Sequence, residues 1–348
     1  MGKIVLIFIL SLYLNAYSTT YNRFMFLNSG IFLALNSDEA NNTNSSVIVQ
    51  EEDINESVHS IVPKLSIALV VNKKKFFRFI PSFMNSLIAY LSNKDIYYNI
   101  KLYDIDTNIS SINENYILYI DTNISKVANL DFNKSIYFPL INKNEVNITK
   151  SNFYFGGIDF KEQTKLLSQL VFSKANIITS NSLIGRKLTE YEKNLSDISY
   201  IFNFPKINYY VLDDKFLYLN IKSSDIAQVL SNITANDIKT KLVLTSQIGY
   251  DPLLISLTQP QDIKNLVIAN SLLNIPVVIN EYSSLLSSNI RFNFINYAID
   301  VLVNKIYNQV QNQDSFYLND FSINMYNNQI DYKTKLFIID KGAFRSLE

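Results

Sequence analysis

The side chains that most often carry enzyme chemistry are scarce in this sequence. It holds one His, His59, and no Cys among 348 residues. A Ser-His-Asp triad would depend on His59, which lies in a polar, acidic stretch, and a thiol nucleophile and the usual zinc ligands are missing. Gly is also rare, with 7 residues, so no phosphate-binding glycine loop is present. We therefore expect a protein that is not an enzyme and that uses no metal or cofactor.

One pair of carboxylates keeps a catalytic alternative open. Asp213 and Asp214 are adjacent in the chain. Because consecutive side chains on a strand point in opposite directions, we interpret the two as solvated residues. A glycosidase or another carboxylate enzyme stays open as a third hypothesis.

A second pattern concerns modification of the chain. The hexapeptide IDTNIS occurs at 105–110 and again at 120–125, and each copy contains an acid two residues before an Asn-x-Ser sequon. About one acid-x-Asn-x-Ser/Thr match is expected by chance, yet seven occur. Their acceptors are Asn41, Asn55, Asn108, Asn123, Asn133, Asn147 and Asn194.

This pattern resembles the sequon of the oligosaccharyltransferase of epsilon-class proteobacteria, and it implies glycosylation of at least one site. Asn55 is the strongest single candidate, because it lies in a linker-like stretch. Two other interpretations exist. Asn and Asp favour turns in any case, and Asp104, Asp106 and Asp121 are possible calcium ligands, although no Gly turn or bidentate Glu accompanies them.

A third group of polar residues follows predicted strands, where ligands lie in an open α/β sheet. We predict that these residues line a cleft: Asn72, Lys73, Asn142, Ser180, Asn181, Asn220, Ser246, Gln247, Tyr250 and Asp251. Lys73, Lys74 and Lys75 could bind an anion or form a solvated basic turn. The stretch before Pro252 is equally compatible with simple turn chemistry.

The N-terminus predicts export. Lys3, the apolar run at 4–14 and small residues at positions −3 and −1 of a cleavage site after Ser18 are typical of a secretory signal peptide at 1–18. The alternative is an uncleaved membrane anchor, which the short apolar run disfavours. An apolar arm and a polar linker follow at 19–63. No later run is long and apolar enough to cross a membrane, and 31 basic residues balance 31 acidic ones, which argues against nucleic acid as a partner. We expect a soluble periplasmic protein of a Gram-negative cell.

From residue 64 onward, strand and helix patterns alternate and predict parallel sheets flanked by helices. The run at 64–71 is a buried strand, 261–273 a helix, 275–280 a strand and 291–311 the longest helix. Asn327-Asn328 between alternating runs predicts a hairpin within 323–340. The number of strands predicts two lobes.

This order resembles the type I periplasmic binding protein fold over roughly 64–348. The opening strand, FYFGGIDFKEQTKLLSQLV with Gln163, and IITSNSLIGRKLTEYEKNL with Gly185 carry the resemblance. It implies two lobes joined by three crossings, with a ligand in the cleft between them. The implied division is 64–157 plus 285–312 for lobe 1 and 158–284 plus 313–348 for lobe 2.

One departure from this family affects the expected function. Amino-acid receptors of this fold carry Ser, Thr and Gly in loops of the first lobe, but the corresponding loops here are NKKK at 72–75 and PLINK at 139–143. We therefore predict a non-catalytic module that binds a protein partner in cell-envelope assembly or maintenance. It resembles, distantly, the activators of peptidoglycan synthases that contain this fold. The alternative is a solute-binding receptor of an ABC-type transporter with an atypical ligand.

Overall fold

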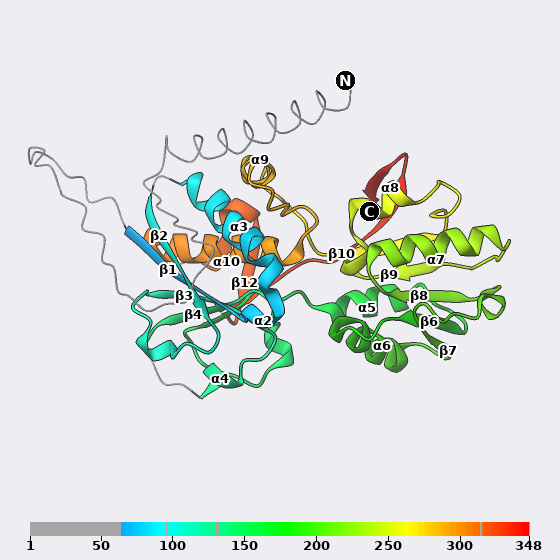
Figure 1. Cartoon of the computed structure of the whole chain (residues 1–348), viewed down its shortest axis with the longest axis horizontal. Helices are drawn as coiled ribbons and strands as arrows, with labels where there is room; N and C mark the ends of the chain where they lie inside the picture. The colour runs from blue at the N-terminus through cyan, green and yellow to red at the C-terminus, as the bar shows by residue number, and fades with distance from the viewer. Residues whose placement is uncertain (1–63, 95, 130–132, 314, 348) are drawn as a thin grey trace, which may run out of the picture. The chain divides into compact units, whose positions relative to one another are not determined.

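The computed structural model describes residues 64–347, apart from 95, 130–132 and 314. The predicted signal peptide at 1–18 and the arm and linker at 19–63 lie outside the described residues, as do His59, Asn41 and Asn55. Two α/β sheets with their helices make up the described chain (Figure 1).

The first sheet has eight strands. Its strands are β1 (Lys64–Val71), β2 (Tyr97–Asp104), β3 (Tyr116–Ile120), β4 (Ser135–Phe138), β5 (Phe153–Phe155), β11 (Tyr317–Leu318), β12 (Ile323–Tyr326) and β13 (Gln329–Ile330). They are arranged in the order β11-β12-β13-β5-β4-β3-β1-β2. Strands β1 to β5 are parallel, and Val71 at the end of β1 lies opposite both Asp104 and Ile120. The residues that follow these strands therefore share one edge.

Both faces of the first sheet are covered, which explains why β1 is apolar throughout. Leu65, Ile67 and Leu69 face a core shared with α3 (Ile80–Ser92), α9 (Val277–Leu285) and α10 (Phe294–Val310). Ala68 and Val70 face a second core, which includes residues of the loops after β2 and β4. Two short helices, α2 (Lys73–Phe76) and α4 (Ser125–Ala128), follow β1 and β3.

The second sheet has seven strands in the order β15-β14-β10-β9-β8-β6-β7. These are β6 (Ala175–Thr179), β7 (Ile198–Asn203), β8 (Phe216–Asn220), β9 (Val243–Thr245), β10 (Leu266–Asn270), β14 (Lys335–Asp340) and β15 (Ala343–Ser346). The helices around it are α5 (Phe160–Ser168), α6 (Leu183–Leu195), α7 (Ser223–Ala235) and α8 (Pro252–Leu257). One core packs α7 and α8 on this sheet, and a second core includes Leu167 of α5.

The predicted two-lobed α/β fold is confirmed, with one refinement. Both sheets are mixed, because β11, β12 and β13 pair antiparallel with one another at one edge of the first sheet, and β14 and β15 are antiparallel strands of the second. The Asn327-Asn328 hairpin is present, with positive φ at both residues and Met325 opposite Ile330. It ends at Ile330, since β14 joins the other sheet.

The element predictions for 261–280 were wrong. Residues 266–270 form strand β10 rather than a helix, and α9 begins at Val277 where a strand was predicted. The short run LVIAN is fully buried between β9 and β14, whereas Val277 and Val278 are exposed on a helix. β-branched residues favour strands only weakly, and packing overrides that preference.

The chain passes between the sheets three times, at 156–159, 271–276 and 331–334. The second and third crossings differ from the predicted division, which placed them near 285 and 312. Residues of α9 pack on α3, and Leu318, Phe321 and Met325 share the core of α10, so both segments belong to the first sheet. Across the described residues, no helix is long and apolar enough to cross a membrane.

Candidate functional site

At the carboxyl end of the second sheet, Asn220 of β8 lies opposite Thr179 of β6, and its carbonyl accepts from the backbone N–H of Ser180 at 3.3 Å. Asn220 is buried and donates its Nδ2 to Oε2 of Glu192 at 2.6 Å and to Oγ1 of Thr189 at 3.3 Å. Glu192 lies on α6, and burial raises its pKa well above the ordinary value of a carboxyl. Asn220 is therefore turned toward the helix and serves the lobe itself.

Gln247, which follows β9, is also held from within the lobe. The backbone N–H of Gln247 donates to Gln163 Oε1 of α5 at 2.9 Å, and Gln163 Nε2 donates to Ser271 Oγ at 2.7 Å. Gln247 Oε1 accepts from the backbone N–H of Ser271 at 2.8 Å. This network ties α5, which follows the first crossing, to the end of β9 and to the end of β10, where the second crossing begins.

The remaining predicted cleft residues of the second lobe differ in burial and in role. Tyr250 is buried and packs on Phe292, Phe337 and Phe344, so it belongs to the core. Asp251 caps α8 by accepting from Leu253 N at 2.8 Å. The buried side chains of Ser246 and Gln247 each keep one polar atom without a partner in the described part of the chain. Ser180 is half-buried, and Asn181 is exposed.

In the first lobe, the predicted residues after β1 contact those after β3. Asn72 caps α2 and donates Nδ2 to Asp121 Oδ2 at 3.1 Å, and Lys75 Nζ donates to Asp121 Oδ1 at 2.8 Å. Desolvation alone would raise the pKa of Asp121, but the bonds from Lys75, Asn72 and Thr122 lower it. Lys73 stays exposed beside this cluster. Asp121 thus already neutralises one of the three lysines that were considered for anion binding.

Asn142 is the one predicted cleft residue that lines a pocket at the first crossing, and Asn147, a predicted glycosylation acceptor, lines it too. Asn142 Oδ1 accepts from Asn144 N at 2.9 Å, and Asn142 Nδ2 donates to the carbonyl of Gly157 at 3.1 Å. Gly157 lies at the first crossing, and a Cβ there would stand 2.3 Å from the backbone carbon of Ile141. Only glycine therefore lets the loop after β4 approach the crossing this closely.

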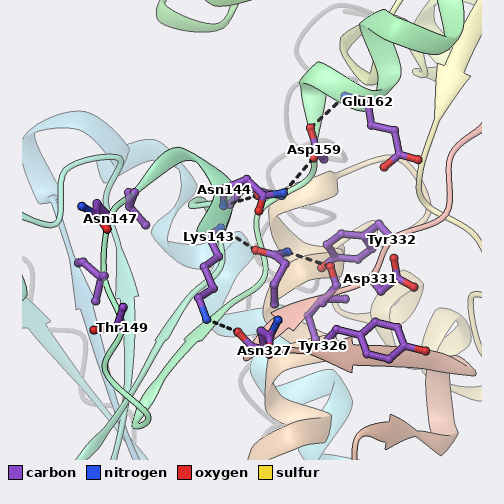
Figure 2. Close-up of a pocket in the computed structure, with 15 residues that line it drawn as sticks. Lys143, Asn144, Asn147, Thr149, Asp159, Glu162, Tyr326, Asn327, Asp331 and Tyr332 are labelled. Carbon is purple, nitrogen blue, oxygen red and sulfur yellow. Dashed lines mark hydrogen bonds between the residues drawn. The ribbon is translucent and has the colours of Figure 1, made fainter.

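We call this pocket the crossing pocket, and its volume is about 460 Å³. Three segments line it: the loop after β4, the start of α5, and the hairpin with the crossing that follows it (Figure 2). Its lining residues are Asn142, Lys143, Asn144, Val146, Asn147, Ile148, Thr149, Asp159, Glu162, Tyr326, Asn327, Gln329, Ile330, Asp331 and Tyr332.

The charges of the crossing pocket are mostly negative. Three carboxylates, those of Asp159, Glu162 and Asp331, share it with one ammonium, that of Lys143. Lys143 Nζ donates to the carbonyl of Asn327 at 2.6 Å, and Asp159 caps α5 by accepting from Glu162 N at 2.9 Å. Glu162 and Asp331 lie on one side of the pocket, and Asn147 and Thr149 lie on the other (Figure 2).

Two of these carboxylates raise the pKa of a neighbouring lysine, Lys333. Lys333 pairs with Asp331 at 2.7 Å, and this hydrogen bond raises the pKa of Lys333, with a further contribution from Glu162. The fields of the two carboxylates therefore overlap at this side of the pocket. Within the described residues, no group of three acidic, His or Cys side chains could hold a metal ion. The pocket is suited to a small polar molecule that donates hydrogen bonds.

Most residues of the crossing pocket escaped the sequence analysis. Asn144 and Asn327 lie on two of its walls and are 183 residues apart in the sequence, and no local pattern joins them. Asp159, which stands directly before α5, was an available signal, because Asp is a preferred helix cap.

The sequence itself matches no protein-family model, and a sequence comparison with curated proteins finds no match. The fold has many counterparts among solved structures. A branched-chain amino acid ABC transporter protein from Thermus thermophilus with bound valine aligns with a TM-score of 0.59 at 10% identity, over 82% of this chain and 96% of that one. The leucine-binding protein LivK from Thermotoga maritima aligns with a TM-score of 0.56 at 10% identity, over 82% and 98%.

A third structure comes from a different class of protein. LpoA from Haemophilus influenzae aligns with a TM-score of 0.53 at 8% identity, covering 81% of this chain and 58% of LpoA. At such identities the likeness establishes the fold alone. The chain has the type I periplasmic binding protein-like fold, distant in sequence from the structures that share it.

Proposed function

We propose that this chain binds a small polar solute, without catalysis, as the exported solute-binding component of an ABC-type transporter. The observation that carries the proposal is the crossing pocket, whose volume of about 460 Å³ lies in the usual range for small-molecule sites. Several of the similar solved structures bear the names of amino-acid transport proteins, which supports the same class of function.

The charge of the crossing pocket narrows the class of solute. The pocket holds three carboxylates and the ammonium of Lys143, and Lys333 pairs with one of the three, Asp331. The remaining excess of negative charge favours a solute with a cationic amine and disfavours a purely anionic one. Asn147, Thr149 and Gln329 offer amide and hydroxyl groups for the polar remainder of the solute. Tyr326, which is exposed, adds an aromatic face at the rim.

A thermal-shift screen of amino acids, polyamines, sugars and organic acids on the full chain tests this proposal. A solute that binds only the folded state raises the melting temperature in proportion to its occupancy. We expect an amine-bearing solute to do so, and Glu162→Gln to weaken its binding about tenfold. Glu281→Gln, on exposed α9 and outside the pocket, is the matched control and should bind as the wild type does.

Two results would contradict the proposal. Preferential binding of an organic acid would reject the assigned class of solute. A screen in which no solute shifts the melting temperature would reject solute binding at this pocket.

A protein partner in the cell envelope is the second candidate function. The fold likeness to LpoA favours it, as do the exposed apolar side chains of α9, where Val277 is 71% and Leu285 80% exposed. The internal hydrogen bonds of Asn220, Gln247 and Asn142 also leave fewer groups for a solute. A pull-down from envelope extract that recovers one stable partner with wild type but not with Val277→Asp would support this candidate over the first.

A further inference from the structure

The acid that precedes most sequons is too frequent to be incidental. The sequence contains nine Asn-x-Ser/Thr tripeptides, and in seven of them an acid stands two residues before the Asn. Acidic residues make up 31 of 348 positions, so about one of the nine would carry that acid by chance. The acid is therefore part of the signal, and its accessibility matters as much as that of the Asn.

The two IDTNIS copies share one local hydrogen bond, from the Ser backbone N–H to the Asn side chain. Asn108 Oδ1 accepts from Ser110 N at 3.1 Å, and Asn123 Oδ1 accepts from Ser125 N at 2.9 Å. Both Asn side chains are exposed, and neither donates its Nδ2 to another described residue. The acceptor amides of the two copies are thus equally available for modification.

The two acids differ sharply. The side chain of Asp106 is 63% exposed, and its one ion-pair partner, Lys126, is also exposed. The side chain of Asp121 is 6% exposed and accepts bonds from Lys75, Asn72 and the Thr122 backbone. The cause is the sheet, because the first copy follows the edge strand β2 and the second follows β3, which lies between β1 and β4.

We propose that Asn108 of the folded chain is N-glycosylated and that Asn123, in the same hexapeptide, is not. An enzyme that reads the acid can reach Asp106, because an exposed ion pair with Lys126 is easily broken. It cannot reach Asp121 without breaking three hydrogen bonds at a buried position.

The reaction is a group transfer from a lipid-linked oligosaccharyl pyrophosphate. The Asn108 Nδ2 forms a bond to the anomeric carbon of the sugar and loses one proton to a base of the enzyme. The bond from that carbon to the pyrophosphate oxygen breaks, and the pyrophosphate leaves with the electron pair. No oxidant or reductant is needed.

Two other sequons serve as internal controls. Asn194 is exposed, but its acid is Glu192, which is buried inside α6 and bonded to Asn220. Asn232 lies in α7 and has Leu230 in place of the acid. We expect neither to be modified in the folded chain.

Glycopeptide mass spectrometry of the full chain, purified from its native cells, tests the proposal. We expect occupancy at Asn108 at least tenfold above that at Asn123, and loss of the Asn108 glycan in Ser110→Ala. Asp106→Ala should reduce it strongly, whereas Lys126→Ala should leave it unchanged. Equal occupancy of the two copies, a preference for Asn123, or no glycan on Asn108 would overturn the proposal.

A second measurement separates the role of the fold from the role of the sequence. The urea-unfolded and the folded chain are each treated with a purified oligosaccharyltransferase that requires the acid, together with its lipid-linked donor. We expect Asn108 and Asn123 to react at similar rates after unfolding and at least tenfold different rates in the folded chain. A persistent difference after unfolding would show that the tertiary structure does not decide between the copies. This proposal does not rest on solute binding.

Discussion

Each lobe buries one carboxyl group that has no cationic partner among the described residues, and the two lobes use this group differently. Asp300 of α10 and Glu192 of α6 are both buried, and neither pairs with a cation among the described residues. Burial raises the pKa of both well above the ordinary value, which favours the neutral acid. A neutral acid acts as a hydrogen-bonding group rather than as a charge, and its neighbours decide what it does.

In the first lobe, Asp300 belongs to a row of hydrogen-bonded polar pairs between α3 and α10, two helices that run in the same direction. We call this row the polar seam. Asn296 donates to Ser82 Oγ at 2.7 Å, Ser86 donates to Asp300 Oδ1 at 2.6 Å, and Asn304 donates to Tyr90 at 2.8 Å. These pairs recur every four residues on both α3 and α10, so a slide of one helix along the other breaks all of them. The seam therefore specifies the register of the two helices.

In the second lobe, Glu192 has a single side-chain partner, Asn220, which comes from the end of β8. The pair holds α6 on the sheet at one point and removes one polar strand-end residue from any role in binding. A series of buried polar pairs therefore fixes how two helices align along each other, whereas a single buried pair fixes the position of one residue.

The largest expected effect that tests this comparison is a pH dependence of stability. The unfolded chain loses the two protons above about pH 4, whereas the folded chain keeps them, so the unfolded state binds fewer protons. The free energy of unfolding should then fall as pH rises, by up to about 1.4 kcal/mol per pH unit for each group, until the folded pKa is reached. Urea titrations between about pH 5 and pH 8 measure this slope.

The double variant Asp300→Asn with Glu192→Gln should flatten that pH dependence, because amides cannot ionise. The single variants Asp300→Asn and Glu192→Gln then show how much of the pH dependence of stability each lobe contributes. Parallel curves for wild type and double variant would show that the two acids are ionised in the fold.

A smaller effect is expected from one buried hydroxyl in each lobe. Tyr90 bonds both Asn304 and Asp320, whereas Tyr218 bonds Ser196 alone. Tyr90→Phe removes two hydrogen bonds of the buried hydroxyl, one of them to a carboxylate, and should lower the free energy of unfolding by about 2 to 3 kcal/mol, whereas Tyr218→Phe removes one and should lower it by about 1 kcal/mol. Chemical denaturation of the two variants measures both losses in the free energy of unfolding. Equal losses would argue against a cooperative polar seam.

The smallest effect concerns the ends of these networks. Ser82→Ala removes one of the two acceptors of the Asn296 amide and should cost about 1 kcal/mol, because the amide is buried. Ser180→Ala removes an exposed bond to Ser182 and should change stability by less than about 0.5 kcal/mol. If Ser82→Ala is as mild as Ser180→Ala, the seam does not extend to the start of α3.

Several features of the fold were predictable because they are local. The Asn327-Asn328 turn needs positive φ at two residues, which Asn tolerates, and the hairpin forms where these residues stand. The apolar run at 64–71 indicated a strand buried on both faces, and β1 is such a strand. The errors at 261–280 came from the same source, because β-branched residues in α9 resemble a strand when packing is ignored.

The candidate sites were less predictable. Strand-end residues such as Asn72 and Asp251 cap helices, a role that their residue types already allow. That Asn220 would turn toward Glu192, 28 positions away, depends on how α6 packs on the sheet. The crossing pocket joins segments nearly two hundred residues apart, and no period or motif encodes that proximity.

By itself, the sequence determined the alternation of strands and helices, the turns that need special backbone angles, and the positions of the sequons, because these depend on residues close together in the chain. Tertiary structure alone decided which copy of IDTNIS keeps its acid exposed and which carboxyls have a raised pKa. The physical reason is that burial and hydrogen bonding are properties of a place in the fold, and six identical residues occupy two different places.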